Sequence, residues 1–198
     1  MNFILGINVE RLTHNTLVIH QKNYIDKLMN DFKIISETRN TDIPIQPGHK
    51  LTTELLHETE SLRKLVDATK YRKVIGSLIY LMTCTRPDIS YSVSILSRYM
   101  QEPRELHWRF LKRLMKYVNT TRDFSLTFQK GKETKINLIG FTDSDYATSL
   151  DDRKSNSAYV FKYNNCTISW NSAKQKTVSL SSTEAEYIAL SSAVKEAV

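Results

Sequence analysis

Hydrophobic residues recur at two different periods along this chain. In the first part they return at every third or fourth position over Lys22–Phe32, from Asp67 to near Arg86-Pro87, and over Glu105–Val118. Such spacing places the apolar side chains on one face of a helix, so we predict three helices there.

Other elements of the first part follow from local signals. Phe3–Glu10 and Thr16–Gln21 are predicted as two strands around a turn. Asp88 is in position to cap a further helix that follows it. Residues 34–58 show no clear period and are expected to be a long connecting segment.

After Lys135 the apolar period changes to two, which is typical of strands. One face of the first strand carries Asn137, Ile139, Phe141 and Asp143. Tyr159–Tyr163 and Cys166–Trp170 are predicted as two more strands. Asn164-Asn165 between them fits a two-residue hairpin turn, because Asn tolerates positive φ.

The last predicted element is a helix that begins at Ser181-Ser182-Thr183. Glu184 follows at the spacing of a capping box, in which the Glu carboxylate returns to the start of the helix. Composition agrees with a globular chain: 40% of residues are hydrophobic and 25% charged, with only 5 Gly and 4 Pro. No apolar run approaches the roughly 20 residues that span a bilayer, so we expect no membrane association.

The net charge of +7 is unevenly distributed. Residues 1–135 hold 22 Lys and Arg against 14 Asp and Glu, whereas residues 136–198 hold 6 against 7. A basic first part joined to a slightly acidic second part suits a protein that binds a polyanion in one place and cations in another.

Four carboxylates in the second part are candidates for cation binding. Asp143 and Asp145 end its first strand, and Glu184 and Glu186 lie in the first turn of the helix after the hairpin. A helix that packs back on the sheet can bring these groups together, and clustered carboxylates favour Mg²⁺ or Mn²⁺. Spacing alone equally allows turn residues at the strand end and acids that complement the helix dipole.

The order of several motifs resembles the Ty1/copia-type retrotransposon Pol polyproteins. The motifs of the second part are Gly140-Phe141-Thr142-Asp143-Ser144-Asp145-Tyr146-Ala147, Asp152-Arg153-Lys154-Ser155, Ile168-Ser169-Trp170 and Ser181-Ser182-Thr183-Glu184-Ala185-Glu186-Tyr187. Those of the first part include Ile75-Gly76-Ser77-Leu78-Ile79-Tyr80-Leu81 and Thr85-Arg86-Pro87-Asp88-Ile89. The resemblance covers essentially the whole chain.

The resemblance implies an RNase H active site that hydrolyses the RNA strand of RNA–DNA hybrids with Mg²⁺ or Mn²⁺ as cofactor. By position, Asp143 and Glu186 match the family's first two catalytic, metal-binding carboxylates. Asp145 and Glu184 then lie beside this pair and are not expected to bind the metal directly. The polymerase's paired-Asp motif and two further RNase H carboxylates are expected outside this chain, so we expect the chain alone not to cleave hybrids.

The resemblance also implies the architecture. Residues 1–135 are expected to form a mainly helical α+β part, the end of the reverse transcriptase and its thumb-like or connection region. Residues 136–198 are expected to form an incomplete RNase H-like α/β half-domain.

Basic residues on one side of the Glu105–Val118 helix have two interpretations. They are Arg109, Lys112, Arg113 and Lys116. They either follow the phosphates of a nucleic acid or form an ordinary solvated helix face.

Three functions stay open at this point: a segment of a working reverse transcriptase/RNase H polyprotein, a catalytically inactive degenerate remnant, and a truncated nucleic-acid-binding or partner-binding module. The partners implied are an RNA–DNA hybrid or other nucleic acid and the rest of the Pol polyprotein. The implied location is cytoplasmic, in virus-like particles, and nuclear.

Overall fold

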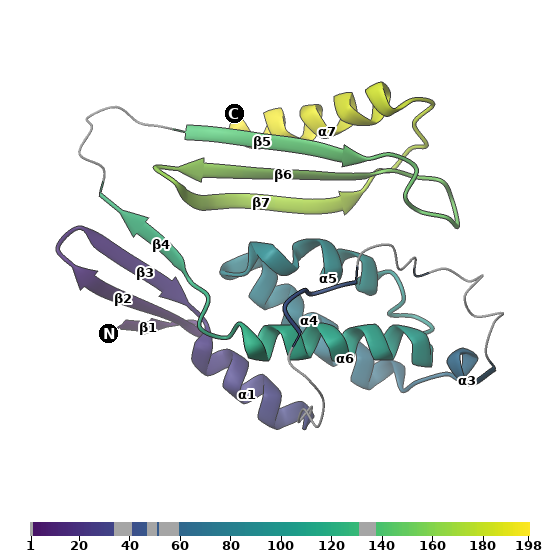
Figure 1. The fold of residues 1–198 in the computed structure, drawn as a ribbon, viewed down its shortest axis with the longest axis horizontal. Helices are drawn as coiled ribbons and strands as arrows, with labels where there is room; N and C mark the ends of the chain where they lie inside the picture. Colours follow the sequence, from purple (N-terminus) through teal and green to yellow (C-terminus); the bar gives the residue numbers. More distant parts are fainter. Residues whose placement is uncertain (1, 34–40, 47–50, 52–59, 131–137) are drawn as a thin grey trace. The chain divides into compact units, whose positions relative to one another are not determined.

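A computed structural model describes residues 2–33, 41–46, 51, 60–130 and 138–198 (Figure 1). Its internal contacts divide the chain into two compact units, Met1–Glu10 with Val18–Ser125 and Arg11–Leu17 with Leu126–Val198. The division falls between Ser125 and Leu126, whereas the domain boundary predicted after residue 135 lies outside the described residues. Most of the predicted connecting segment over residues 34–58 is also outside them.

The first unit is built around helices, most of which the sequence predicts. They are α1 (Lys22–Phe32), α3 (Glu60–Arg63), α4 (Ala68–Cys84), α5 (Ser90–Ser97) and α6 (Glu105–Thr120). The core of the unit consists of their apolar faces, including Ile25, Val74, Ile75, Leu78, Leu81, Val93, Leu96, Leu111, Leu114 and Met115. The three helices predicted from periodicity are therefore confirmed as α1, α4 and α6.

Side chains satisfy the first N–H groups of the two longest helices of this unit. Asp67 caps α4, where its Oδ1 accepts hydrogen bonds from the N–H groups of Thr69 and Lys70 at 2.8 and 3.2 Å. In α6 the buried ring of His107 accepts from the Arg104 N–H through Nδ1 at 3.0 Å. Both contacts satisfy donors that a helix start leaves unpaired.

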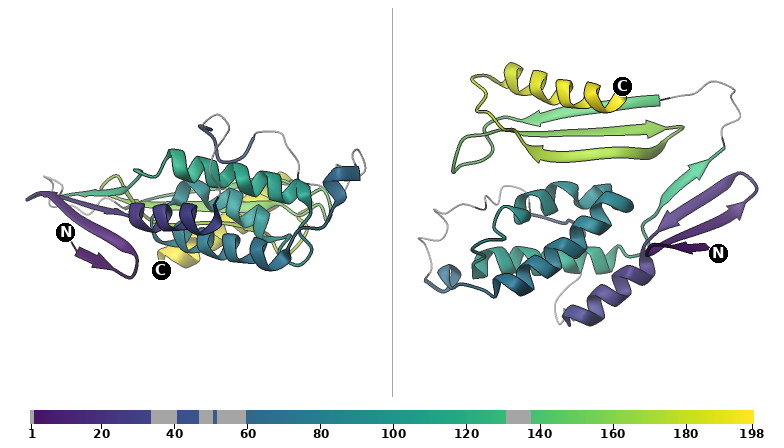
Figure 2. Two further views of the ribbon diagram at one scale, coloured as in Figure 1. Left: turned by 90° about the horizontal axis from the view of Figure 1, so that it is seen from below. Right: turned by 180° about the vertical axis from the view of Figure 1, so that it is seen from behind.

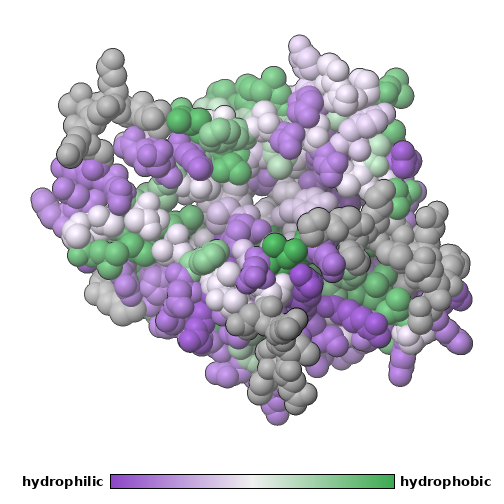
Figure 3. Space-filling model, viewed as in Figure 1, coloured by the Kyte–Doolittle hydropathy of each residue, from purple (hydrophilic) through white to green (hydrophobic). Residues whose placement is uncertain are grey.

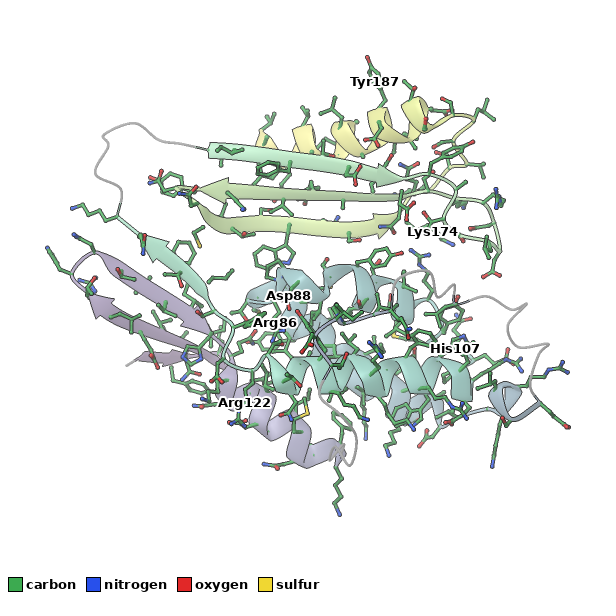
Figure 4. The ribbon with its side chains drawn as sticks, viewed as in Figure 1. Arg86, Asp88, His107, Arg122, Lys174 and Tyr187 are labelled. Carbon is green, nitrogen blue, oxygen red and sulfur yellow. The ribbon has the colours of Figure 1, made fainter. Side chains whose placement is uncertain are left out.

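The prediction that Asp88 caps a helix is wrong. Pro87–Ile89 forms a 3₁₀ turn (η1), and α5 follows it without a side-chain cap. The Asp88 carboxylate instead accepts from Arg86 Nε and Nη2 at 2.8 and 2.7 Å and from the Tyr117 hydroxyl at 2.9 Å. Arg86 is only 1% exposed, and a buried guanidinium needs a charged partner more than a helix needs a cap (Figure 4).

A sheet with the order β1-β2-β3-β4 joins the beginning of the chain to residues after α6. Its strands are β1 (Asn2–Ile4), β2 (Ile7–Thr13), β3 (Thr16–His20) and β4 (Leu126–Gln129). The single strand predicted over Phe3–Glu10 is thus wrong. Leu5 and Gly6 turn the chain with φ of 50° and 79°, and the Tyr80 hydroxyl donates to the Leu5 carbonyl.

The second unit contains an antiparallel sheet in the order β5-β6-β7. The strands are β5 (Leu138–Asp145), β6 (Asn156–Tyr163) and β7 (Cys166–Lys174). The hairpin turn predicted at Asn164-Asn165 is confirmed, because both residues have positive φ, 44° and 69°.

Helix α7 (Ser182–Ala197) covers one face of this sheet along β5 and β6 (Figure 2). Its buried side chains are all small, namely Ala185, Ala189 and Ala193. Phe161 fills the space beneath the helix, and its ring lies so close to Gly140 that a Cβ there would stand 2.5 Å from Cε1. Glycine at 140 is therefore required by packing.

The outer side of α7 is apolar as well. Tyr187, Leu190 and Val194 are 71%, 46% and 52% exposed, and Tyr187 points away from the sheet (Figure 4). Other exposed apolar side chains belong to β5, so hydrophobic surface gathers over these two elements (Figure 3).

Candidate functional site

The structure brings Asp143 and Glu186 to one backbone N–H group. Asp143 Oδ1 accepts a hydrogen bond from the N–H of Ser144 at 2.9 Å, and Glu186 Oε1 accepts from the same N–H at 3.3 Å. Asp143 lies near the end of β5, and Glu186 lies in the first turns of α7. Two carboxylates that are 43 positions apart along the chain therefore converge on one point.

The position of this N–H explains how the carboxylates meet. In the described residues β5 has a neighbouring strand, β6, on one side only. Because the Ser144 N–H donates to carboxylates, it points out of the ladder, away from β6. Glu186 reaches it from the helix above the sheet, and Asp143 reaches it from the adjacent position on the strand. Both side chains belong to residues that are exposed to solvent.

Glu184 has a different position from Glu186. Its Oε2 accepts from the N–H of Leu180 at 2.7 Å, while Ser181 Oγ accepts from the Glu184 N–H at 3.1 Å. This is a capping arrangement, although the carboxylate returns to the residue before the N-cap Ser181. The carboxylate of Glu184 thus serves the start of α7.

Asp145 is the last residue of β5 and is exposed. Its backbone carbonyl accepts from the Thr148 hydroxyl at 2.6 Å and so begins the loop to β6. The register places Asp145 opposite Asn156, which in turn lies opposite Lys174 at the end of β7.

An ion pair that the sequence analysis did not predict stabilises this end of the sheet. Lys174 Nζ donates to Asp152 Oδ2 at 2.8 Å, and Lys154 Nζ lies 3.8 Å from the same oxygen. The hydrogen bond from Lys174, with a further one from Ser149, lowers the pKa of Asp152 to about 2. The pair fixes the loop after Asp145 to the end of β7.

The carboxylate pair suits one hydrated divalent cation. Mg²⁺ commonly binds through one or two carboxylates together with waters and substrate phosphates, so Asp143 and Glu186 could supply the protein oxygens for one ion. Within the described part of the chain, no three His, Cys, Asp or Glu side chains come together as a metal-binding group. A site for two bridged ions therefore needs carboxylates beyond this set.

The basic residues predicted to contact nucleic acid lie on one stripe of α6. Their spacing along a helix of 3.6 residues per turn puts them within about 100° of one another. The stripe consists of Arg109, Lys112, Arg113 and Lys116. Glu105, one turn before it, lies 3.6 Å from Arg109 Nε and 3.9 Å from Lys112 Nζ. The stripe thus carries net positive charge and a single acid at its beginning.

A groove of about 450 Å³ in the second unit was not predicted. It lies between the β2–β3 turn, the end of β4 and the β6–β7 turn. Its lining residues are Arg11, His14, Asn15, Thr16, Leu17, Phe128, Gln129, Lys130, Tyr163 and Asn164. Three segments that are far apart in the sequence form it, so no local sequence pattern predicts it. None of the predicted site residues takes part.

Among the described residues, none of the helices is both long enough and apolar enough to cross a lipid bilayer.

Comparison with known proteins shows the family to which the chain belongs. No protein-family model matches it, and no solved structure matches it significantly. It is 44% identical to the secreted RxLR effector protein 161 of Plasmopara viticola over 128 residues, which cover 65% of this chain and 89% of the effector. It is 35% identical over 196 residues to the retrovirus-related Pol polyprotein from transposon TNT 1-94 of Nicotiana tabacum.

That match covers 98% of this chain but only 14% of the tobacco polyprotein. An uncharacterized mitochondrial protein of Arabidopsis thaliana is 34% identical over 96% of this chain and 74% of its own length. Several transposon proteins share 31–37% identity across nearly all of the chain. The chain therefore belongs to the Ty1/copia-type family of retrotransposon Pol polyproteins.

Proposed function

We propose that this chain supplies Asp143 and Glu186 to the divalent-cation site of a reverse transcriptase/RNase H polyprotein that hydrolyses the RNA strand of RNA–DNA hybrids. The observation that carries the proposal is the convergence of both carboxylates on the Ser144 N–H. Family membership supports it, because relatives that match 94–98% of this chain include Pol polyproteins. The rest of that polyprotein is the partner that we expect to complete the site.

The arrangement of charges fits this function. Two exposed carboxylates that accept from one N–H group repel each other, and a bound divalent cation would remove the repulsion. A bound Mg²⁺ or Mn²⁺ would activate a water and stabilise the leaving 3′ oxygen. Asp143 and Glu186 would hold the cation, and the Ser144 N–H donates to both carboxylates.

We further propose that the second unit is the beginning of an RNase H-like domain and that the first unit is a thumb- or connection-like region. The α6 stripe would contact the phosphates of the hybrid, which gives affinity without sequence readout. In that role the chain would work in virus-like particles and in the nucleus.

One observation favours a second candidate, a truncated module without catalysis. This chain covers 89% of the P. viticola effector, so in that relative a region of this family makes up most of a protein. On this alternative the chain would keep nucleic-acid or partner binding, and the carboxylate pair would have no catalytic role.

Binding of Mn²⁺ tests the proposed cation site directly. In the intact chain, Mn²⁺ should broaden the amide resonance of Ser144 before those of residues elsewhere on the sheet, because its N–H lies beside both carboxylates. Asp143→Asn and Glu186→Gln should each weaken Mn²⁺ binding by at least about tenfold, equivalent to about 1.4 kcal/mol. The measurement is Mn²⁺ titration followed by ¹H–¹⁵N spectra.

The matched control is Glu184→Gln, which removes one negative charge two residues from Glu186 but only at the helix start. It should leave the Mn²⁺ affinity within a factor of about two, as expected for a charge that makes no contact with the ion. If Glu184→Gln and Glu186→Gln weaken binding equally, the ion is attracted by general charge and the proposed site is wrong.

A salt titration tests the proposed hybrid contact of α6. Lys112→Gln combined with Lys116→Gln should reduce the slope of log K against log salt by about 2, because each phosphate contact contributes about 0.9. The loss should be the same for hybrids of unrelated sequence. Fluorescence anisotropy with a labelled RNA–DNA hybrid measures it.

The control removes two charges from other exposed helix positions, Lys27→Gln with Lys73→Gln. It should leave the slope nearly unchanged. An equal reduction in both double variants would mean that only net charge attracts the hybrid, and the stripe would then be an ordinary solvated face.

A further inference from the structure

The side chain of Gln175 is buried between the sheet and α7 with all of its hydrogen-bonding groups in use. It is 5% exposed. Its Nε2 donates to Ser157 Oγ on β6 and to the Ala185 carbonyl in α7, each at 2.9 Å. Its Oε1 accepts from the Ser179 hydroxyl at 2.8 Å. One carboxamide therefore joins a strand, the loop before α7 and the first turns of the helix.

The backbone of Gln175 extends the same connection to the loop after β5. The Gln175 N–H donates to the Ser155 carbonyl at 2.9 Å, and Ser155 Oγ accepts from the N–H of Ala147 at 3.0 Å. Ser155 is fully buried. The residues just after Asp145 and the first turns of α7 are thus tied to one buried residue.

This connection acts on the carboxylate pair through one peptide unit. Ala185, whose carbonyl accepts from Gln175, immediately precedes Glu186. The buried side chains of α7 are alanines, which are small, so apolar contact restrains the rotation of the helix and its position along the strands less than larger side chains would. A directional hydrogen bond to the Ala185 carbonyl does fix both.

We propose that Gln175 is a positioning residue, which sets the first turns of α7 so that the Glu186 carboxylate meets Asp143 at the Ser144 N–H. The proposal rests on the proposed cation site for its functional meaning. Gln175 itself contacts neither carboxylate in the described hydrogen bonds, so it acts through Ala185.

The decisive variant is Gln175→Met, which keeps the length of the side chain and removes every hydrogen bond of the carboxamide. The readout is the nuclear Overhauser effect between the Ser144 amide proton and the Glu186 Hγ protons, recorded without any metal. We expect this signal to fall at least several-fold while the dispersed resonances of β6 and β7 persist. Mn²⁺ binding should weaken in parallel.

The matched control is Ser172→Ala. Ser172 accepts a buried hydrogen bond from Asn156 Nδ2 at 2.9 Å, so the variant removes one bond of equal length from the same sheet without touching α7. It should leave the Ser144–Glu186 signal unchanged. A signal that stays at full strength in folded Gln175→Met overturns the proposal.

Ser179→Ala decides the question if Gln175→Met fails to fold. It removes only the donor that holds Oε1, so the carboxamide can turn away from Ala185, and the signal should weaken in a folded protein. If the Ser144–Glu186 signal is fully retained in Ser179→Ala, the positioning role of Gln175 is contradicted. The nuclear Overhauser signal is recorded without metal, so it tests the position of Glu186 independently of cation binding. If the wild-type chain does not bind Mn²⁺, the proposed function is wrong, but the result on Gln175 is unaffected.

Discussion

Asp143→Asn should abolish hybrid cleavage in an extended protein that joins this chain to the segment following the matched region of the tobacco polyprotein. Asn keeps the shape of Asp but lacks the negative charge that holds a divalent cation. We therefore expect the cleavage rate to fall by at least about two orders of magnitude while the fold persists. Release of labelled RNA from an RNA–DNA hybrid in the presence of Mg²⁺ measures the rate.

Two neighbouring variants make this experiment specific. Glu186→Gln should reduce cleavage as strongly, because Glu186 shares the Ser144 N–H with Asp143. Glu184→Gln should change it little, because the Glu184 carboxylate binds the Leu180 N–H at the start of α7, an effect worth about 0.3–1 kcal/mol. Loss of cleavage in Glu184→Gln but not in Glu186→Gln would show that the assignment of the two acids is reversed. The chain without the extension should not cleave.

Asp88→Ala should lower the free energy of unfolding of the first unit by about 3 kcal/mol. It leaves the buried guanidinium of Arg86 without its carboxylate, and breaking a buried ion pair from one side costs about 3–5 kcal/mol. We expect the lower end because the Asp88 side chain is 28% exposed and because the Thr121 carbonyl and hydroxyl still accept from Arg86. The aromatic rings of Tyr117 and Phe124, 5.7 and 5.3 Å from the guanidinium carbon, also remain.

The two tryptophans allow the unfolding to be followed unit by unit. Trp108 lies in the first unit and Trp170 in the second, so urea unfolding in a Trp170→Phe background reports on the first unit alone. Glu102→Ala is the control, since its ion pair with Arg104 is 2.6 Å long but Glu102 is 64% exposed. Such surface pairs contribute about 0–1 kcal/mol. Equal losses of unfolding free energy in the two variants would show that the ion pair of Arg86 and Asp88 stabilises the unit no more than a surface pair does.

Helices were the part of the fold that the sequence predicted well. In α1, α4 and α6 the apolar spacing and the burial come from the same periodic face, so the pattern and the structure agree. The helical pattern predicted from Asp67 also begins where α4 begins, since Asp67 is its N-cap. The role of Asp88 was predicted wrongly, because its partners Arg86 and Tyr117 depend on tertiary packing that no local pattern contains.

Strands were predicted less well, for reasons that differ between them. The alternation over Phe3–Glu10 runs through Leu5-Gly6 without a break, and only the positive φ of both residues reveals the turn. β4 is four residues long, too short for alternation to stand out.

The candidate site was also predicted only in part. The resemblance selected Asp143 and Glu186 from four acids, whereas their meeting at the Ser144 N–H required the packing of α7 on the sheet. Gln175 could not be found from sequence. It resembles any polar loop residue there, and its partners Ser157 and Ala185 lie ten or more positions away.

The position of β4 next to β3 has a consequence for the order of folding. The Lys130 N–H donates to the Asn15 carbonyl at 2.8 Å, so the β2–β3 turn gains this contact only from residues more than a hundred positions later in the chain. Contacts of such long range form slowly, since a long loop must close before they contribute. During synthesis the helices α4, α5 and α6 can assemble from contacts between neighbours in the chain, while β3 lacks its second neighbouring strand until β4 has been made. Completion of this small sheet, and not formation of the helical core, is therefore expected to set the rate at which the newly made chain becomes native.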